Sequence, residues 1–130
     1  MNINERVQEL ALEKYCCAQI VMKIGLEYVN KENPDMIKAM KGLCLGTHIQ
    51  EQCGTLSAAA CLLSLFAEER APELIQRMAG WFEDRFKSFS CEAILSANNN
   101  DISKCGELTA ETCQQCFELL EEYDLLPDEE

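Results

Sequence analysis

Cysteine is the residue type of this chain with the widest chemistry, because a thiolate can bind a metal, attack a disulfide or be oxidised. Nine of the 130 residues are cysteine. A secreted disulfide scaffold would be smaller and rich in loops, whereas the same richness in a cytosolic protein indicates metal binding or redox chemistry. The odd number also argues against a framework in which every cysteine is paired. The nine are Cys16, Cys17, Cys44, Cys53, Cys61, Cys91, Cys105, Cys113 and Cys116.

Cys53 stands directly before residues 54–67, which carry no charged side chain. The alanine, leucine and serine residues of this segment suit a helix that is apolar on every side and therefore buried. The segment is too short to span a bilayer, which needs about 20 apolar residues. At the start of such a helix, the unpaired backbone N–H groups and the positive end of the helix dipole stabilise a thiolate. We therefore expect Cys53 to be a reactive sulfur with a lowered pKa.

Three further cysteines fall at positions that could join Cys53 in one site. Cys91 begins a short expected helix after Ser90, Cys105 precedes a glycine near another helix start, and Cys17 lies on the apolar seam of the first helix. Four thiolates are the ligands that tetrahedral zinc or an iron–sulfur cluster requires. Two close pairs would instead form reversible disulfides. We predict that the four sulfurs converge near one end of the central helix.

Four short motifs surround these four cysteines: Tyr-Cys-Cys-Ala-Gln at 15–19, Cys-Gly-Thr-Leu-Ser-Ala at 53–58, Ser-Cys-Glu-Ala-Ile-Leu at 90–95 and Lys-Cys-Gly-Glu-Leu at 104–108. On these motifs the chain resembles the C_GCAxxG_C_C family of redox-active proteins, which is named for its cysteine pattern. The resemblance covers most of the chain. Two positions depart from the pattern, since the family's alanine is Thr55 here and its second glycine is Ala58.

The resemblance implies an all-helical domain with a redox or metal-binding site. The site residues it implies are Cys17, Cys53, Cys91 and Cys105. The cofactor it implies is an iron–sulfur cluster of the 2Fe–2S type or zinc, while a dithiol couple would need none. A redox partner protein is expected, and neither the substrate nor a catalytic residue follows from the pattern.

Four other residues are secondary candidates for the site. Cys44 lies in a glycine-containing segment and could be a further ligand or a resolving thiol, and His48 could be a ligand or a proton carrier. Cys113 and Cys116 form a C-x-x-C, but they lie inside an expected helix without a preceding strand, which favours core packing over a thioredoxin-like motif. Cys61 is expected to be a small apolar core residue.

These residues must be positioned by helices, because the apolar residues follow helical spacing and no strand alternation or linker is present. The length suits a single domain over residues 1–130. We predict an all-α, single-domain bundle of five or six helices around the buried central helix at about 54–67. The others are expected at 3–30, from Asn33-Pro34 to Gly42, from Pro72 to about Lys87, from Cys91, and from Cys105 or Thr109 to about Tyr123.

The net charge of −12 argues against nucleic acid and anionic membranes as partners, because both attract Lys and Arg. The charged first residues do not form a signal peptide, so we expect a cytoplasmic protein. The long first helix makes a homodimer an open alternative to a monomer. A second functional hypothesis is a non-catalytic, partner-binding helical module whose cysteines are mostly structural.

Overall fold

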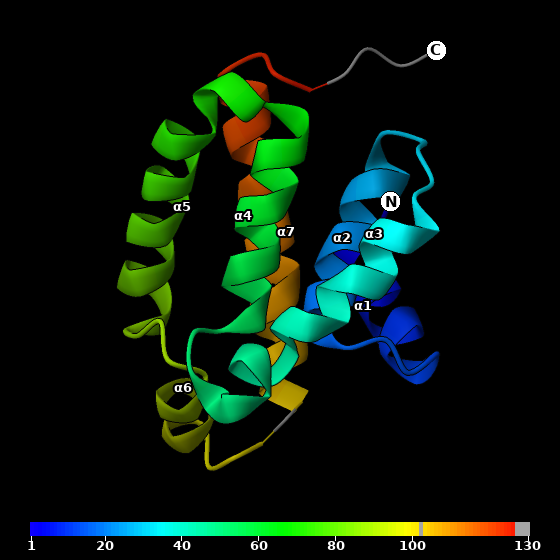
Figure 1. Cartoon of the computed structure of the whole chain (residues 1–130). Coiled ribbons are helices and arrows are strands. Elements are labelled where there is room, and N and C mark those ends of the chain that lie inside the picture. Colours follow the sequence, from blue (N-terminus) through cyan, green and yellow to red (C-terminus); the bar gives the residue numbers. More distant parts are fainter. Residues whose placement is uncertain (102, 127–130) are drawn as a thin grey trace.

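The computed structural model of the chain describes residues 1–101 and 103–126, with the backbone alone at residue 103. Within these residues the secondary structure is helical, so the predicted all-α domain is confirmed (Figure 1). The α-helices are α1 (Ile3–Leu12), α2 (Cys17–Tyr28), α3 (Pro34–Ala39), α4 (Gly54–Phe66), α5 (Ala71–Phe86), α6 (Cys91–Ala97) and α7 (Ser103–Glu122). Three short helical turns join them: η1 (Met40–Leu43), η2 (Gly46–Gln50) and η3 (Glu68–Arg70).

Helix α4 forms the centre of the bundle, as its lack of charged side chains predicts. It contacts α2, α5 and α7, and Figure 1 shows it between α5 on one side and α2 with α3 on the other. Ala58, Ala59, Leu62 and Leu63 are fully buried. The side chain of Leu62 lies so close to Gly25 of α2 that a Cβ at position 25 would overlap it. The small residue on α2 therefore allows the two helices to pack tightly.

The prediction of one continuous helix over residues 3–30 is wrong, because the chain breaks between α1 and α2. Lys14 has a left-handed backbone with φ of 71°. Cys16 is extended at the N-cap of α2, where its N–H donates to the side-chain oxygen of Gln19 at 3.2 Å. The apolar periodicity continues across the break because α1 and α2 both pack against α7. Periodicity reports which positions are buried, and it does not report whether the helix between them is continuous.

The other helices agree with the expected segments. Asn33 caps α3 by accepting a hydrogen bond from the N–H of Met36, and Ser90 caps α6 by accepting one from the N–H of Ala93. The seven α-helices of the described residues exceed the expected five or six, and the break after α1 accounts for one of them. Residues 42–52, which lie between two of the expected helices, contain η2 and the end of η1.

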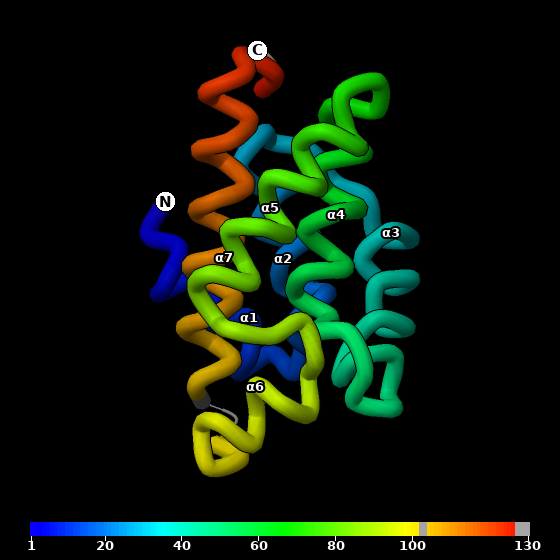
Figure 2. The backbone as a smooth tube through the Cα atoms, turned by 90° about the vertical axis from the view of Figure 1, so that its left-hand side faces the viewer, coloured from blue at the N-terminus to red at the C-terminus, as the bar shows by residue number. Residues whose placement is uncertain are grey.

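No helix in the described part of the chain combines the length and the apolar character needed to cross a membrane. The starts of α4, α6 and α7 lie at one end of the bundle, the lower end in Figures 1 and 2. Because cysteines stand at these starts, this end of the bundle contains the candidate site.

Candidate redox site

Four cysteines from four separate helix starts line one cavity of about 430 Å³. Cys17 is the first residue of α2, Cys53 directly precedes α4, Cys91 is the first residue of α6 and Cys105 lies in the first turn of α7. We refer to this space as the four-cysteine cavity. Its wall is otherwise mostly apolar and includes Leu45, Gly54, Thr55, Ile94, Leu95 and Leu108.

The starts of α4 and α6 are held together by main-chain hydrogen bonds. The N–H of Cys53 donates to the carbonyl oxygen of Phe89 at 2.7 Å, and the N–H of Cys91 donates to the carbonyl oxygen of Glu51. These bonds flank a short antiparallel bridge between Gln52 and Ser90. In this pairing Cys53 stands opposite Phe89 and Cys91 opposite Glu51, so the two cysteines lie one residue to either side of the bridge although they are far apart in the sequence.

A glycine allows the segment before Cys53 to pack against the start of α4. A Cβ at Gly54 would overlap the carbonyl oxygen of Leu43, which is main chain and cannot move aside as a side chain would. The absence of a side chain at Gly54 therefore brings the backbone at Leu43 and Cys44 close to the cavity.

The prediction of a lowered pKa for Cys53 is wrong. The residue is only 8% exposed, and this burial raises the pKa of its thiol because the charged form loses hydration. The main-chain N–H groups of Leu56 and Thr55 at the start of α4 lower the pKa, but by less than burial raises it. The N–H groups at the helix start thus lower the pKa of Cys53 as expected, but the effect of burial is larger.

The thiols of Cys91 and Cys105 show the same behaviour. Burial raises the pKa of Cys91, and the neighbouring Cys17 adds to that increase. Burial raises the pKa of Cys105 to about 11, with further increases from Cys17, Cys53 and Cys91. Each sulfur therefore disfavours charge on its neighbours, as expected of thiols that share one cavity.

The donor set of the four-cysteine cavity consists of four thiols in a mostly apolar wall. Within residues 1–101 and 103–126, no three His, Cys, Asp or Glu side chains are grouped closely enough to hold one ion. A two-iron cluster takes four cysteine ligands, two on each iron. The cavity supplies that number and type of ligand, but it does not hold the sulfurs in a ready-made metal site.

A disulfide joins Cys16 to Cys44 beside the cavity. Their Cα atoms are 6.1 Å apart, and 28 residues separate them in the sequence. Cys44 is one of the secondary candidates, and its partner Cys16 is not among the residues predicted for the site. Nothing in the spacing of Cys16 could have indicated this pairing, because it depends on how η1 packs against α2.

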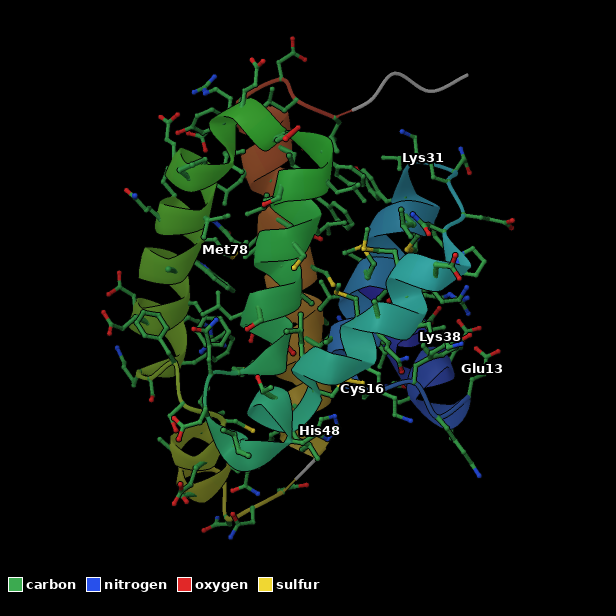
Figure 3. All side chains as sticks on the ribbon, viewed as in Figure 1. Glu13, Cys16, Lys31, Lys38, His48 and Met78 are labelled. Atoms are coloured by element: carbon green, nitrogen blue, oxygen red, sulfur yellow. A yellow bond between two sulfur atoms is a disulfide. The ribbon has the colours of Figure 1, made fainter. Side chains whose placement is uncertain are left out.

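The remaining candidates do not line the four-cysteine cavity. His48 is exposed, and its Nε2 lies 2.9 Å from the carbonyl oxygen of Lys41; Figure 3 shows its position relative to Cys16. Cys113 and Cys116 are fully buried in the core. Burial raises the pKa of Cys113 to about 12 and also raises that of Cys116. Their burial favours core packing for this C-x-x-C.

Comparison with known families agrees with the arrangement of the cysteines. A family model described as "Putative redox-active protein (C_GCAxxG_C_C)" matches residues 15–119. The chain belongs to this family. No curated protein and no solved structure is similar enough to the chain to count as a match.

The departure of this C_GCAxxG_C_C protein at Thr55 has a structural role. The hydroxyl of Thr109 donates to the carbonyl oxygen of Cys105 at 2.7 Å. The hydroxyl of Thr55 lies 3.1 Å from the same Thr109 hydroxyl, in a buried position. Since Thr109 has already used its one proton, Thr55 is the donor in this contact. The two hydroxyls connect the helix that follows Cys53 to the helix that carries Cys105.

Proposed function

We propose that this C_GCAxxG_C_C protein is an electron carrier or redox sensor that binds an iron–sulfur cluster of the 2Fe–2S type in the four-cysteine cavity. The observation that carries the proposal is the convergence of Cys17, Cys53, Cys91 and Cys105, from four helix starts, on one largely apolar cavity. Four cysteine ligands are the usual requirement of such a cluster.

The raised pKa values favour a bound cofactor over a free dithiol couple. A thiol attacks a disulfide as its thiolate, and burial makes the thiolates of Cys53, Cys91 and Cys105 scarce at neutral pH. Coordination to a metal removes the proton outright, so the same buried thiols would serve as ligands. A dithiol couple reacts faster when its sulfurs are exposed to the partner disulfide, whereas a metal-binding site is better protected when its sulfurs are shielded.

The surrounding residues have definite tasks in this proposal. The four thiolates would hold the cofactor, and an iron–sulfur cluster would supply one-electron transfer. The side chains of Ile94, Leu95 and Leu108 give the cavity an apolar wall, and an apolar wall around a cluster influences its reduction potential. Gly54 and Thr55 keep the start of α4 in place through close backbone packing and through the hydroxyl pair with α7.

Electron transfer also requires a partner, and we propose a redox protein in that role. Cys17 and Cys105 are only partly buried, so they are the sulfurs of the site nearest to solvent. Transient redox complexes use small interfaces, which a patch around these two residues could provide.

The test is to purify the protein without oxygen and to measure its visible absorption, iron and acid-labile sulfide. The same measurements are made on Cys53→Ser and on the matched control Cys61→Ser. Cys61 lies on α4, the helix that Cys53 directly precedes, but it does not line the cavity. We expect brown protein with iron and sulfide in the wild type and in Cys61→Ser, and its loss in Cys53→Ser.

Other results would favour a function other than cluster binding. Colourless protein that contains zinc would indicate a metal-binding site without electron transfer. Colourless, metal-free protein would leave a dithiol couple or a partner-binding module with structural cysteines. A thiol count before and after mild oxidant would then separate these two, because only the couple loses cavity thiols reversibly.

A further inference from the structure

A short segment next to the four-cysteine cavity is fixed at both of its ends. We call residues 45–50 the strap. At its start, Cys44 is joined by the disulfide to Cys16. At its end, the carbonyl oxygen of Glu51 accepts from the N–H of Cys91. Leu45 and Gln50, the first and last residues of the strap, both line the cavity. The strap therefore forms part of the cavity wall, with a covalent anchor before its first residue and a hydrogen-bonded anchor after its last.

The strap has a backbone that needs such anchors. Leu45, Gly46, Thr47, His48 and Gln50 have φ values between 52° and 62°. Residues with side chains rarely adopt this left-handed region, and Thr47 is especially disfavoured because it is β-branched. A conformation of this kind persists only where the surrounding structure enforces it.

Packing contributes little to holding the strap. Leu45 is 52% exposed and Ile49 is 69% exposed, so these two apolar side chains gain little from burial. The contact between His48 and the carbonyl oxygen of Lys41 is an exposed one. A segment with few buried contacts and an unfavourable backbone is expected to rearrange when an anchor is removed.

The two sulfurs of the disulfide differ in their accessibility. Cys44 is only 2% exposed, whereas Cys16 is partly exposed at the N-cap of α2, a helix of 12 residues. An external thiolate would therefore attack the sulfur of Cys16. Once freed, a Cys16 thiolate would lie at the positive end of the helix dipole, which stabilises it as a leaving group.

We propose that the Cys16–Cys44 disulfide is a redox latch, whose reduction by an external dithiol releases the strap and opens the four-cysteine cavity. In the first step, a thiolate of the dithiol bonds to the sulfur of Cys16, and the bond to Cys44 breaks. Cys44 leaves with the electron pair and takes up a proton. In the second step, the other thiolate of the dithiol attacks the mixed disulfide and releases Cys16, which is also protonated. The dithiol becomes a disulfide, and the protein gains two electrons and two protons. This proposal goes beyond the cluster and does not depend on it.

Cys91 is a suitable reporter for opening, because it lines the cavity and is nearly buried. Trypsin cleaves after Lys87 and Lys104, so it releases Cys91 in a peptide with no other cysteine. The experiment measures the rate at which N-ethylmaleimide labels Cys91 in metal-free folded protein by mass spectrometry. The oxidised protein is compared with protein that was treated with dithiothreitol and then desalted without oxygen. We expect labelling of Cys91 to be about tenfold faster after reduction, as for a site that exchanges by local opening.

Two controls separate a local latch from general loosening. Cys16→Ser/Cys44→Ser should label at the reduced rate without any reductant and should not respond to dithiothreitol. Cys113 and Cys116 lie in the core, and their labelling should stay slow in every sample. If the double variant does not fold, the wild-type comparison alone decides the question.

Three results would overturn the latch. The first is unchanged labelling of Cys91 after mass spectrometry shows that the disulfide is open. The second is an equal increase at Cys113 and Cys116, which would mean that the whole domain loosens. The third is the finding that Cys16 and Cys44 are not joined in the oxidised protein. If the protein binds a cluster, loss of iron to a chelator before and after reduction is a second readout. If reduction speeds the labelling of Cys91 in a protein that binds no metal, the latch is supported and the cluster is refuted. If the protein holds a cluster that a chelator removes no faster after reduction, the cluster is supported and the latch is refuted.

Discussion

Loss of the Cys16–Cys44 disulfide should lower the stability of the domain by a calculable amount. The bond closes a loop of 28 residues. The chain-entropy relation for a loop of this length gives about 3.5 kcal/mol, because the cross-link restricts the unfolded chain. Relaxation of a single left-handed residue of the strap after release would return roughly 1 kcal/mol of this amount. We therefore expect a loss of about 2–3.5 kcal/mol in the free energy of unfolding.

The assay is urea unfolding followed by far-ultraviolet circular dichroism, with oxidised wild type, reduced wild type and Cys16→Ser/Cys44→Ser compared at one pH. The last two samples should agree, because the other seven cysteines are unpaired in the folded protein and reduction has no second bond to break. The slope of free energy against urea should increase when the cross-link is absent, since the unfolded chain then exposes more surface. Cys61→Ser is the control that removes a sulfur without touching the disulfide.

Equal stability of the oxidised and reduced proteins would contradict the pairing of Cys16 with Cys44. A reduced wild type much less stable than the double variant would show that another disulfide exists. The first result would also remove the physical basis of the latch.

Three further predictions concern the cavity wall and its thiols. Gly54→Ala should destabilise the domain by about 1–3 kcal/mol, because the new methyl group meets a main-chain carbonyl. The control Gly80→Ala, which has open space around it, should instead stabilise the domain by about 0.5–1 kcal/mol. Chemical denaturation of the two variants measures both changes. Thr55→Val should cost about 1–2 kcal/mol because it removes the donor to the buried hydroxyl of Thr109, whereas Thr55→Ser should cost less; equal losses in the two variants would show that packing, and not the hydrogen bond, is responsible. The folded protein holds the pKa of Cys105 at about 11, above the ordinary 9.0, so the unfolded chain ionises first and stability should be retained below pH 9 and fall as the pH rises toward 11. Thermal unfolding between pH 8 and 11 should show a shallower fall for Cys105→Ser, and an unchanged slope would mean that this thiol is not shielded.

The features that the sequence predicted well are those that depend on local composition. Residues 54–67 lack charge, and a helix without charge has no stable place on the surface, so the buried centre of the bundle followed directly. The starts of α3 and α6 agree with the helices expected from Asn33-Pro34 and from Cys91, and Asn33 and Ser90 cap them because their side-chain oxygens suit the first N–H groups of a helix. The cysteine motifs indicated the family, which the family model confirms.

The features that could not be predicted depend on contacts between distant segments. The break after α1 follows an ordinary lysine, Lys14, whose left-handed backbone has no clear sequence signal. The disulfide requires Cys44 to approach the start of α2, and Gly54 permits that approach only because it lacks a Cβ that would meet the backbone there. The strap's left-handed backbone likewise depends on anchors at both of its ends. None of these contacts leaves a periodic pattern in the sequence.

The error at Cys53 has a further consequence for how the chain divides its chemistry. A helix start lowers the pKa of a thiol only while the sulfur remains hydrated, and burial reverses the outcome when water is excluded. The buried Cys53 and Cys91 are therefore poorly suited to exchange with an external thiol, whereas the partly exposed Cys16 is suited to it. In fully reduced, metal-free protein at pH 7, we expect N-ethylmaleimide to label Cys16 faster than Cys91, which is only 9% exposed. Peptide mapping after short pulses measures both rates. A faster reaction at Cys91 would mean that the cavity is open enough to perform exchange itself, and the separate roles of the two sites would then have to be abandoned.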